Sequence, residues 1–250
     1  MKKGLCRLCD QTKDLIKAHG IPRSFFKEFK EGYPHAVFFD VSESADREAT
    51  YVQAGVYDQG ILCTECEPKF SEFDRYGWEI LGSVSLQNPI QEPGYPPHAH
   101  RVFCDTDKLK RFILAVLWRA SVSTHSFYSY VSLGPYEDIL RGRIFDPAPL
   151  AIDEFPTSVL HFDQASLGIY EKGILFPPMR ERAEDGSNHL VIYLKDLKIV
   201  IRVDRRARQR LFDPFLISDP DSFVMAEFPV KMMKRERGFV PAIMRKLKGG

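Results

Sequence analysis

Four cysteines, arranged in two closely spaced pairs, are the residues of this sequence with the clearest chemical meaning. Both pairs have the form Cys-x-x-Cys: Cys6 with Cys9, and Cys63 with Cys66. Such a pair on a tight turn directs two thiolates toward one point, and two pairs supply the four sulfur ligands of a tetrahedral zinc. We therefore predict one structural Zn2+ held by all four side chains, whose binding would draw together two distant parts of the chain.

Two other chemistries use paired cysteines: a disulfide bond and a redox-active Cys-x-x-Cys. The sequence begins MKKGLCRLCD, with Cys and Asp where a signal peptide has its apolar stretch, which favours reduced thiols in a cytoplasmic protein. No thioredoxin-like βαβ pattern surrounds either pair, which argues against redox chemistry. The fifth cysteine, Cys104, has apolar neighbours and is expected to be a small core residue.

The segment after the second cysteine pair has the pattern of a helix. Phe70, Phe73 and Trp78 recur at helical spacing, and Pro68 stands near the expected first turn. The chain thus runs from a first cysteine turn through an extended segment to a second cysteine turn that opens a helix. This order predicts a treble-clef zinc module over residues 1–84.

This region resembles the HNH-endonuclease group of treble-clef proteins, over about the first third of the chain. In that group a first Cys-x-x-Cys pair is followed by a segment that ends in His and an Ile-Pro-like pair, and a second Cys-x-x-Cys pair opens the helix. Here the segment His19-Gly20-Ile21-Pro22 matches the first feature, and Cys63 to Cys66 matches the second. The resemblance implies a nucleic-acid-interacting, metal-dependent endonuclease. His19 would be its general base, and Asp58 and Glu67 would be oxygen ligands of Mg2+ or Mn2+.

Three positions depart from the pattern of the group. Ala18 stands where Asp or His usually binds the catalytic metal, Asp58 is nearest to the usual Asn, and Glu67 replaces the usual His. Each candidate also has a structural alternative: His19 bonded to a loop carbonyl, Asp58 capping a turn, and Glu67 stabilising the first helical turn. Two functions therefore stay open. One is a divergent nuclease; the other is a non-catalytic protein-interaction subunit of a larger complex, such as a bacterial defence or mobile-element system.

Basic residues concentrate in the C-terminal part of the chain. The whole sequence has a net charge of +1, but residues 180–250 contain 16 Lys and Arg against 10 Asp and Glu. Guanidinium groups bind phosphate oxygens in a bidentate manner, so this part is predicted to contact nucleic acid; a solvated surface kept soluble by its charge is the alternative. The predicted contact residues are Arg202, Arg205, Arg206, Arg208, Arg210, Lys234, Arg235 and Arg237.

The rest of the chain predicts a second domain over residues 105–250. Residues 85–104 contain four prolines and read as a linker or draped loop. Asp105 is expected to cap a helix. Stretches of alternating or β-branched and aromatic residues predict strands at 159–162, 168–176, 189–194, 197–203 and 222–230, with Lys195-Asp196 as a hairpin turn. No apolar run reaches the roughly 20 residues of a membrane span. The predicted fold is α+β: the treble-clef module followed by a helix-then-antiparallel-sheet domain.

Overall fold

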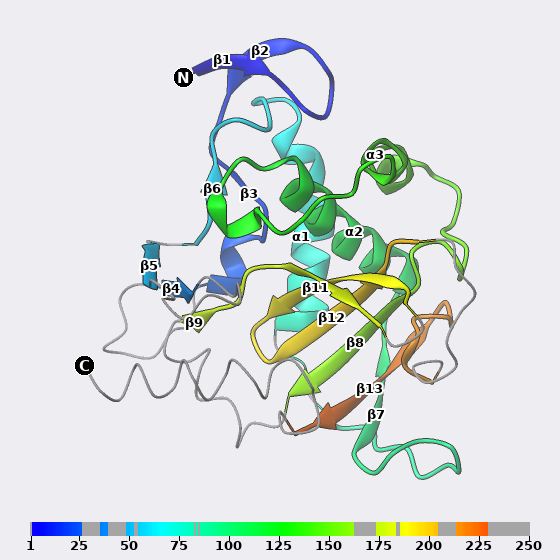
Figure 1. Ribbon diagram of the computed structural model, residues 1–250. Coiled ribbons are helices and arrows are strands. Elements are labelled where there is room, and N and C mark those ends of the chain that lie inside the picture. The colour runs from blue at the N-terminus through cyan, green and yellow to red at the C-terminus, as the bar shows by residue number, and fades with distance from the viewer. Residues whose placement is uncertain are drawn as a thin grey trace.

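The computed structural model describes residues 2–26, 36–39, 49–52, 55–82, 84, 86–162, 174–183, 186–204 and 214–229 of the 250-residue chain. Within them the fold is mixed α+β, with helices packed against one face of a six-stranded sheet (Figure 1). The α+β class predicted from the sequence is confirmed. None of the described helices combines the length and the apolar character needed to cross a lipid bilayer.

The sheet has the strand order β10-β11-β12-β8-β13-β7. Neighbouring strands are antiparallel except β13 and β8, which are parallel. The predicted turn at Lys195-Asp196 closes the β11–β12 hairpin, and Lys195 has the left-handed φ of 52° that a two-residue hairpin needs. The strands are β7 Ala99–Phe103, β8 Thr157–Phe162, β10 Met179–Arg182, β11 Asn188–Leu194, β12 Leu197–Arg202 and β13 Ser222–Phe228.

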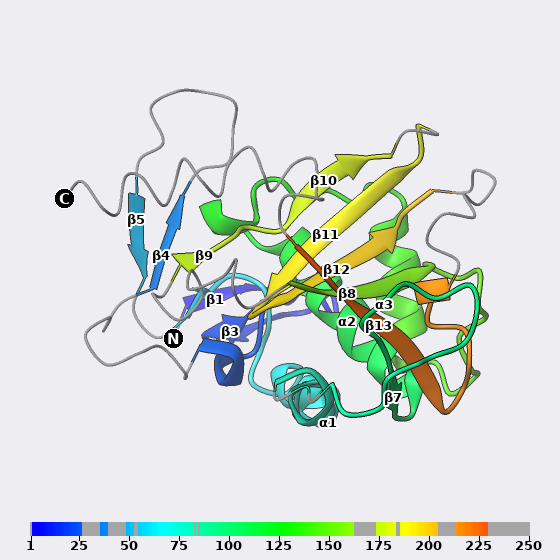
Figure 2. The same ribbon diagram turned by 90° about the horizontal axis from the view of Figure 1, so that it is seen from below.

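Helix α2 (Thr106–Val122) runs through the centre of the molecule and is buried along most of its length. Its predicted cap is confirmed, because the Asp105 carboxylate accepts a hydrogen bond of 3.0 Å from the backbone N–H of Lys108. Figure 2 shows α2 with α1 (Ser71–Gly77) and α3 (Tyr136–Phe145) on the same side of the sheet. The helices thus form one layer and the sheet the other.

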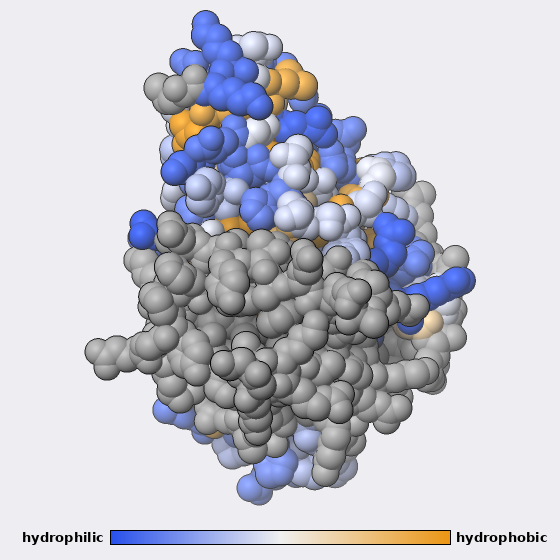
Figure 3. Space-filling model, turned by 60° about the vertical axis from the view of Figure 1, so that its left-hand side comes forward, coloured by the Kyte–Doolittle hydropathy of each residue, from blue (hydrophilic) through white to orange (hydrophobic). Residues whose placement is uncertain are grey.

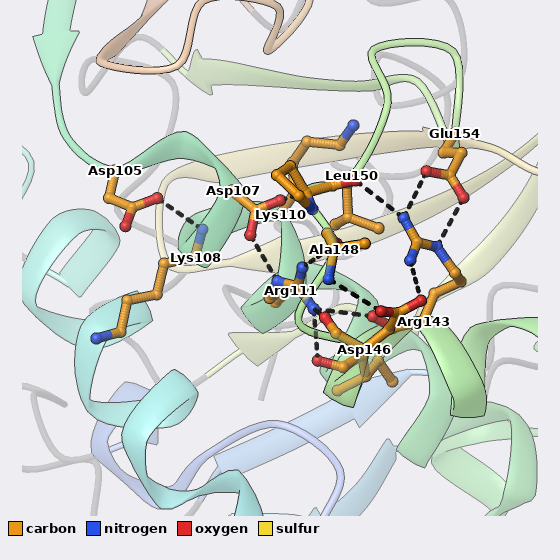
Figure 4. Close-up of polar contacts among 12 residues, drawn as sticks. Asp105, Asp107, Lys108, Lys110, Arg111, Arg143, Asp146, Ala148, Leu150 and Glu154 are labelled. Atoms are coloured by element: carbon orange, nitrogen blue, oxygen red, sulfur yellow. Dashed lines mark hydrogen bonds and ion pairs between the residues drawn. The ribbon is translucent and has the colours of Figure 1, made fainter.

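Buried arginine and lysine side chains fasten the chain after α3 to α2 (Figure 4). The Arg111 guanidinium donates to the carbonyls of Arg143, Ile144 and Ala148, while Lys110 donates to the carbonyl of Ala151. The buried carbonyls of this loop are thereby satisfied by side chains instead of by secondary structure. This network belongs to the scaffold.

The segment predicted to be a linker contains a strand. Residues 99–103 form β7, which pairs with β13 from Ala99 opposite Ala226 to Phe103 opposite Ser222. Val102 and Phe103 favour an extended backbone and lie beyond the prolines, so they can join a sheet edge. One buried apolar cluster also contains residues of both predicted domains, including Leu15, Phe70, Phe112 and Ile192.

Short elements make up the N-terminal region. The β1–β2 hairpin projects from the body near the N-terminus (Figure 1). The elements are β1 Lys2–Leu5, β2 Thr12–Leu15, β3 Ala18–His19, the 3-10 helix Arg23–Phe26, β4 Ala36–Phe39, β5 Ala49–Val52, β6 Tyr57–Asp58, the 3-10 helix Glu67–Phe70, α1 and the π-helical turn Trp78–Gly82. Two further short elements lie later in the chain, the 3-10 helix Ser126–Tyr128 and β9 Ile174–Leu175.

Candidate metal centre

The four paired cysteines meet at one point of the structure. Their sulfur atoms all lie within 4.8 Å of one another. A tetrahedron of zinc–sulfur bonds has sulfur–sulfur edges of about 3.8 Å, so small side-chain adjustments suffice to bind the ion. Cys6, Cys63 and Cys66 are buried and Cys9 is half-buried, which would shield the metal from solvent. The four cysteines are positioned to coordinate a metal ion, in agreement with the predicted structural zinc.

Backbone hydrogen bonds shape each cysteine turn. In the first turn, the N–H of Cys6 donates to the carbonyl of Gln11 and that of Asp10 to the carbonyl of Cys6, both at 2.9 Å. In the second, the N–H groups of Cys66 and Glu67 both donate to the carbonyl of Cys63 at 3.1 Å. The second turn leads directly into the 3-10 helix Glu67–Phe70 and then into α1, so the predicted opening of a helix at the second pair is confirmed.

The two turns are also joined to each other without the metal. The N–H of Arg7 donates to the carbonyl of Ile61 at 2.8 Å, and the N–H of Ile16 donates to the carbonyl of Leu62 at 3.0 Å. These bonds hold the sulfur atoms in range of one ion, so part of the ordering cost of metal binding is met by the fold.

The electrostatics of the cluster suit a cation. Burial raises the pKa of Cys6, but N–H groups of the backbone at Cys9, Cys63 and Leu8 outweigh it and bring the pKa to about 7. Burial, followed by hydrogen bonding among the thiols, raises the pKa of Cys66. The thiolate form is thus favoured at Cys6 and disfavoured at Cys66, and a bound zinc ion would stabilise the thiolate form of its ligands.

Ion pairs attach the first cysteine turn to α3. Arg7 pairs with Glu137 at 3.0 Å, and Asp10 pairs with Arg141 at 2.5 Å. These side chains are partly exposed, so each pair contributes little to stability. Their consequence is orientation, since they fix the turn over the helical layer.

His19 and Asp58 point away from each other. Strands β3 and β6 are antiparallel, with Ala18 opposite Asp58 and His19 opposite Tyr57. Adjacent residues of a strand face opposite sides, so His19 shares a face with Tyr57, and Asp58 shares the other with Ala18. The rings of His19 and Tyr57 are 6.0 Å apart, edge to face. The expected catalytic base is therefore separated from its expected metal ligand.

The Asp58 carboxylate joins its own turn to the loop that follows α2. One carboxylate oxygen accepts hydrogen bonds from the hydroxyls of Ser123 and Thr124 and from the N–H of Thr124, at 2.6 to 3.0 Å, and the other accepts from the N–H of Gly60 at 2.6 Å. Burial alone would raise the pKa of Asp58, but these donors, led by the Thr124 N–H, lower it below its ordinary value. The side chain is 7% exposed. It performs the capping role that was the structural alternative.

Glu67 is the first residue of the 3-10 helix Glu67–Phe70. This is the position that its structural alternative expects, in which an acidic side chain stabilises the first helical turn. Burial is the main cause that raises its pKa, so its charged form is disfavoured. Among the described residues, no group of three or more metal-ligating side chains is present besides the four cysteines. His19, Asp58 and Glu67 are all described, and the structure does not bring them together as one metal site.

The segment that carries the HNH resemblance is packed against Tyr128. The Tyr128 hydroxyl accepts a hydrogen bond of 3.0 Å from the N–H of Ile21, which is itself buried. A Cβ at Gly20 would lie 2.5 Å from the Tyr128 ring, so this position requires glycine. Ile21 and Gly20 therefore have structural reasons to be present. No pattern near Ile21 in the sequence predicts its contact with Tyr128, because Tyr128 follows α2, about a hundred residues later in the chain.

Comparisons of the chain with protein-family models, with curated proteins and with solved structures gave no match. The relationship to HNH proteins stays a prediction from the sequence, as do the treble-clef classification and the domain boundaries.

Of the eight predicted nucleic-acid contacts, only Arg202 is among the residues that the structure describes. Arg202 is buried in β12, and its guanidinium donates to Asp204 at 3.0 Å. Asp204 in turn accepts from the N–H of Asn188 at 2.7 Å, so the pair fastens two neighbouring strands. The other predicted contacts lie outside the described residues: Arg205, Arg206, Arg208, Arg210, Lys234, Arg235 and Arg237.

Proposed function

We propose that this protein is a non-catalytic, zinc-stabilised nucleic-acid-binding protein, with a degenerate HNH-like treble clef as its N-terminal module. The observation that carries the proposal is the convergence of four cysteine sulfurs within 4.8 Å of one another. The zinc is structural, because four thiolates fill its coordination sphere and leave no position for substrate or water. It fastens the β1–β2 hairpin to the helical layer.

Charge supports nucleic acid as the partner of the hairpin region. Residues 2–26 contain six Lys and Arg against two Asp. Lys3 stands opposite Asp14 across the hairpin, and Lys13 pairs with Glu65 at 2.6 Å. For Lys2 and Lys17 no carboxylate partner is found among the described residues, and both are exposed. Ammonium groups of this kind attract phosphates and release counterions from them.

Three features support the non-catalytic assignment. Ala18 replaces a usual ligand of the catalytic metal in HNH proteins. The Asp58 carboxylate already accepts four hydrogen bonds. His19 faces the opposite side of its strand pair from Asp58. A phosphodiesterase of this type needs a base and a metal at one phosphate, and these residues would not supply both.

We expect salt-dependent binding to nucleic acid. Affinity measured by fluorescence anisotropy should fall linearly on a log–log plot against salt, with a slope of roughly −0.7 per single-strand phosphate or −0.9 per duplex phosphate contacted. Lys17→Glu should weaken binding and reduce the slope, whereas Arg75→Glu makes the same charge change on an exposed face of α1 and should have little effect. A triple Arg→Glu change at Arg205, Arg206 and Arg208 tests the C-terminal cluster in the same assay.

Absence of binding at low salt, in protein shown to be folded and zinc-loaded, would reject this function. It would favour the other alternative, a protein-interaction subunit.

We expect no metal-dependent cleavage. Incubation of DNA or RNA with wild-type protein and Mg2+ or Mn2+ should give no more product than incubation with EDTA, because the expected base and ligands are not gathered at one site. The matched variant is His19→Ala, checked for retained zinc. Cleavage by wild type that His19→Ala abolishes would overturn the non-catalytic assignment and restore the divergent nuclease.

A further inference from the structure

A groove of about 460 Å³ lies beside the cysteine cluster, at the base of the β1–β2 hairpin. Its lining consists of Lys2, Leu15, Ile16, Lys17 and Gln59. Two side chains of this lining are aliphatic, two are cationic and one is an amide, and none is acidic. Figure 3 shows the surface around the hairpin as a mainly hydrophilic projection with small apolar patches. The groove therefore combines apolar surface with positive charge.

An exposed aromatic ring stands next to the groove. Tyr57 is 38% exposed, and the ammonium of Lys17 lies 4.8 Å from the centre of its ring. Tyr57 directly precedes Asp58 in β6, two residues before the groove residue Gln59. The ammonium lies over this ring, so an aromatic surface and a positive charge adjoin, as they do where unpaired bases stack and their phosphates are neutralised.

Resting on the proposed function, we propose that this groove and Tyr57 bind an unpaired segment of nucleic acid in preference to a duplex. One base stacks on the exposed part of Tyr57, the neighbouring base lies over the half-buried Ile16, and Lys2 and Lys17 contact the flanking phosphates. In a duplex the bases are already stacked, and their faces are not available to an aromatic ring or to an aliphatic groove. Lysines alone would not distinguish the two forms, so the preference comes from the apolar and aromatic part of the surface.

The groove is anchored to the metal centre and to the turn at Asp58. Leu15 bridges to Cys63, and Ile16 bonds to the backbone of Leu62, so the groove wall rests on the metal centre. Gln59 lies in the turn that the Asp58 carboxylate closes through Gly60. The arrangement gives both the zinc and Asp58 a positioning role for the binding surface.

The test compares single-stranded and duplex probes on the zinc-loaded full chain. Homopolymers of about a dozen thymidines or uridines and a duplex of similar length are titrated by fluorescence anisotropy at one salt concentration. Wild type should bind at least one single strand more tightly than the duplex. Tyr57→Ala should weaken single-strand binding about tenfold and leave duplex binding within about twofold, whereas Tyr57→Phe should retain wild-type affinity.

Phe103→Ala is the matched control, since Phe103 is a 65% exposed ring on the distant edge strand β7. The proposal is overturned if Tyr57→Ala affects the single strands no more than Phe103→Ala does, or if wild type binds the duplex at least as tightly. Equal binding of both probe types would contradict this preference and leave the proposed function standing. Failure to bind either probe would reject both. The thymidine and uridine arms show whether DNA or RNA is preferred.

Discussion

Purified protein is expected to contain one zinc ion per chain, and loss of that ion is expected to unfold the region around the cysteines. Binding at a four-thiolate site is worth on the order of 10 kcal/mol, and most of it is free energy of folding. Three of the four sulfurs also lie in the apolar core that joins the hairpin to α2. Elemental analysis gives the stoichiometry, and thermal unfolding with and without a strong chelator gives the effect.

The double variant Cys63→Ser, Cys66→Ser should lose the zinc and melt about 10 °C or more below wild type. Cys104→Ser is the matched control, because Cys104 is half-buried but lies outside the cluster. That variant should keep its zinc. Less than half an equivalent of zinc in wild type, or full retention in the double variant, would contradict the assignment.

The metal ligands could be predicted from the sequence because their chemistry is local. Two Cys-x-x-Cys turns need only short-range geometry, and the same holds for the Asp105 helix cap and for the Lys195-Asp196 hairpin. Each cysteine turn, the cap and the hairpin are completed within a few residues of the chain, whereas the meeting of the two cysteine turns depends on contacts between distant segments. The structure accordingly agrees with all three predictions.

The features that the sequence did not predict depend on distant residues. Asp58 is held by Ser123 and Thr124, which follow α2, and no pattern near Asp58 announces those donors. Strand β7 forms because β13 offers it an edge from the other end of the chain. Arg202 reads as one member of a basic run, but it is the last residue of β12, a strand whose residues are buried on both faces of the sheet. Tertiary contacts override the local pattern in each case.

Replacing Asp58 by alanine is expected to lower the free energy of unfolding by about 3 kcal/mol. The change leaves the N–H groups of Gly60 and Thr124 and two hydroxyls without their acceptor, and bonds to a charged acceptor contribute about 1.5–3 kcal/mol each without being additive. Asp58→Asn should cost less, since one oxygen remains. Asp153→Ala, at an exposed aspartate, should have almost no effect and is the control.

The pH dependence and the metal dependence of this effect identify its cause. Because the pKa of Asp58 is lowered in the folded protein, its stabilisation is present above the unfolded pKa of about 3.9 and disappears as the pH falls through that value toward the folded pKa. The difference in free energy of unfolding between wild type and Asp58→Asn should therefore narrow in acid. Comparing the two proteins cancels the acid-induced loss of zinc, which both share.

A ligand of a second metal would behave differently: added Mg2+ or Mn2+ would stabilise wild type but not Asp58→Asn. We expect no such difference, since the Asp58 oxygens are already held by Gly60, Ser123 and Thr124. A metal-dependent gain confined to wild type would return Asp58 to the metal site that the HNH resemblance implies.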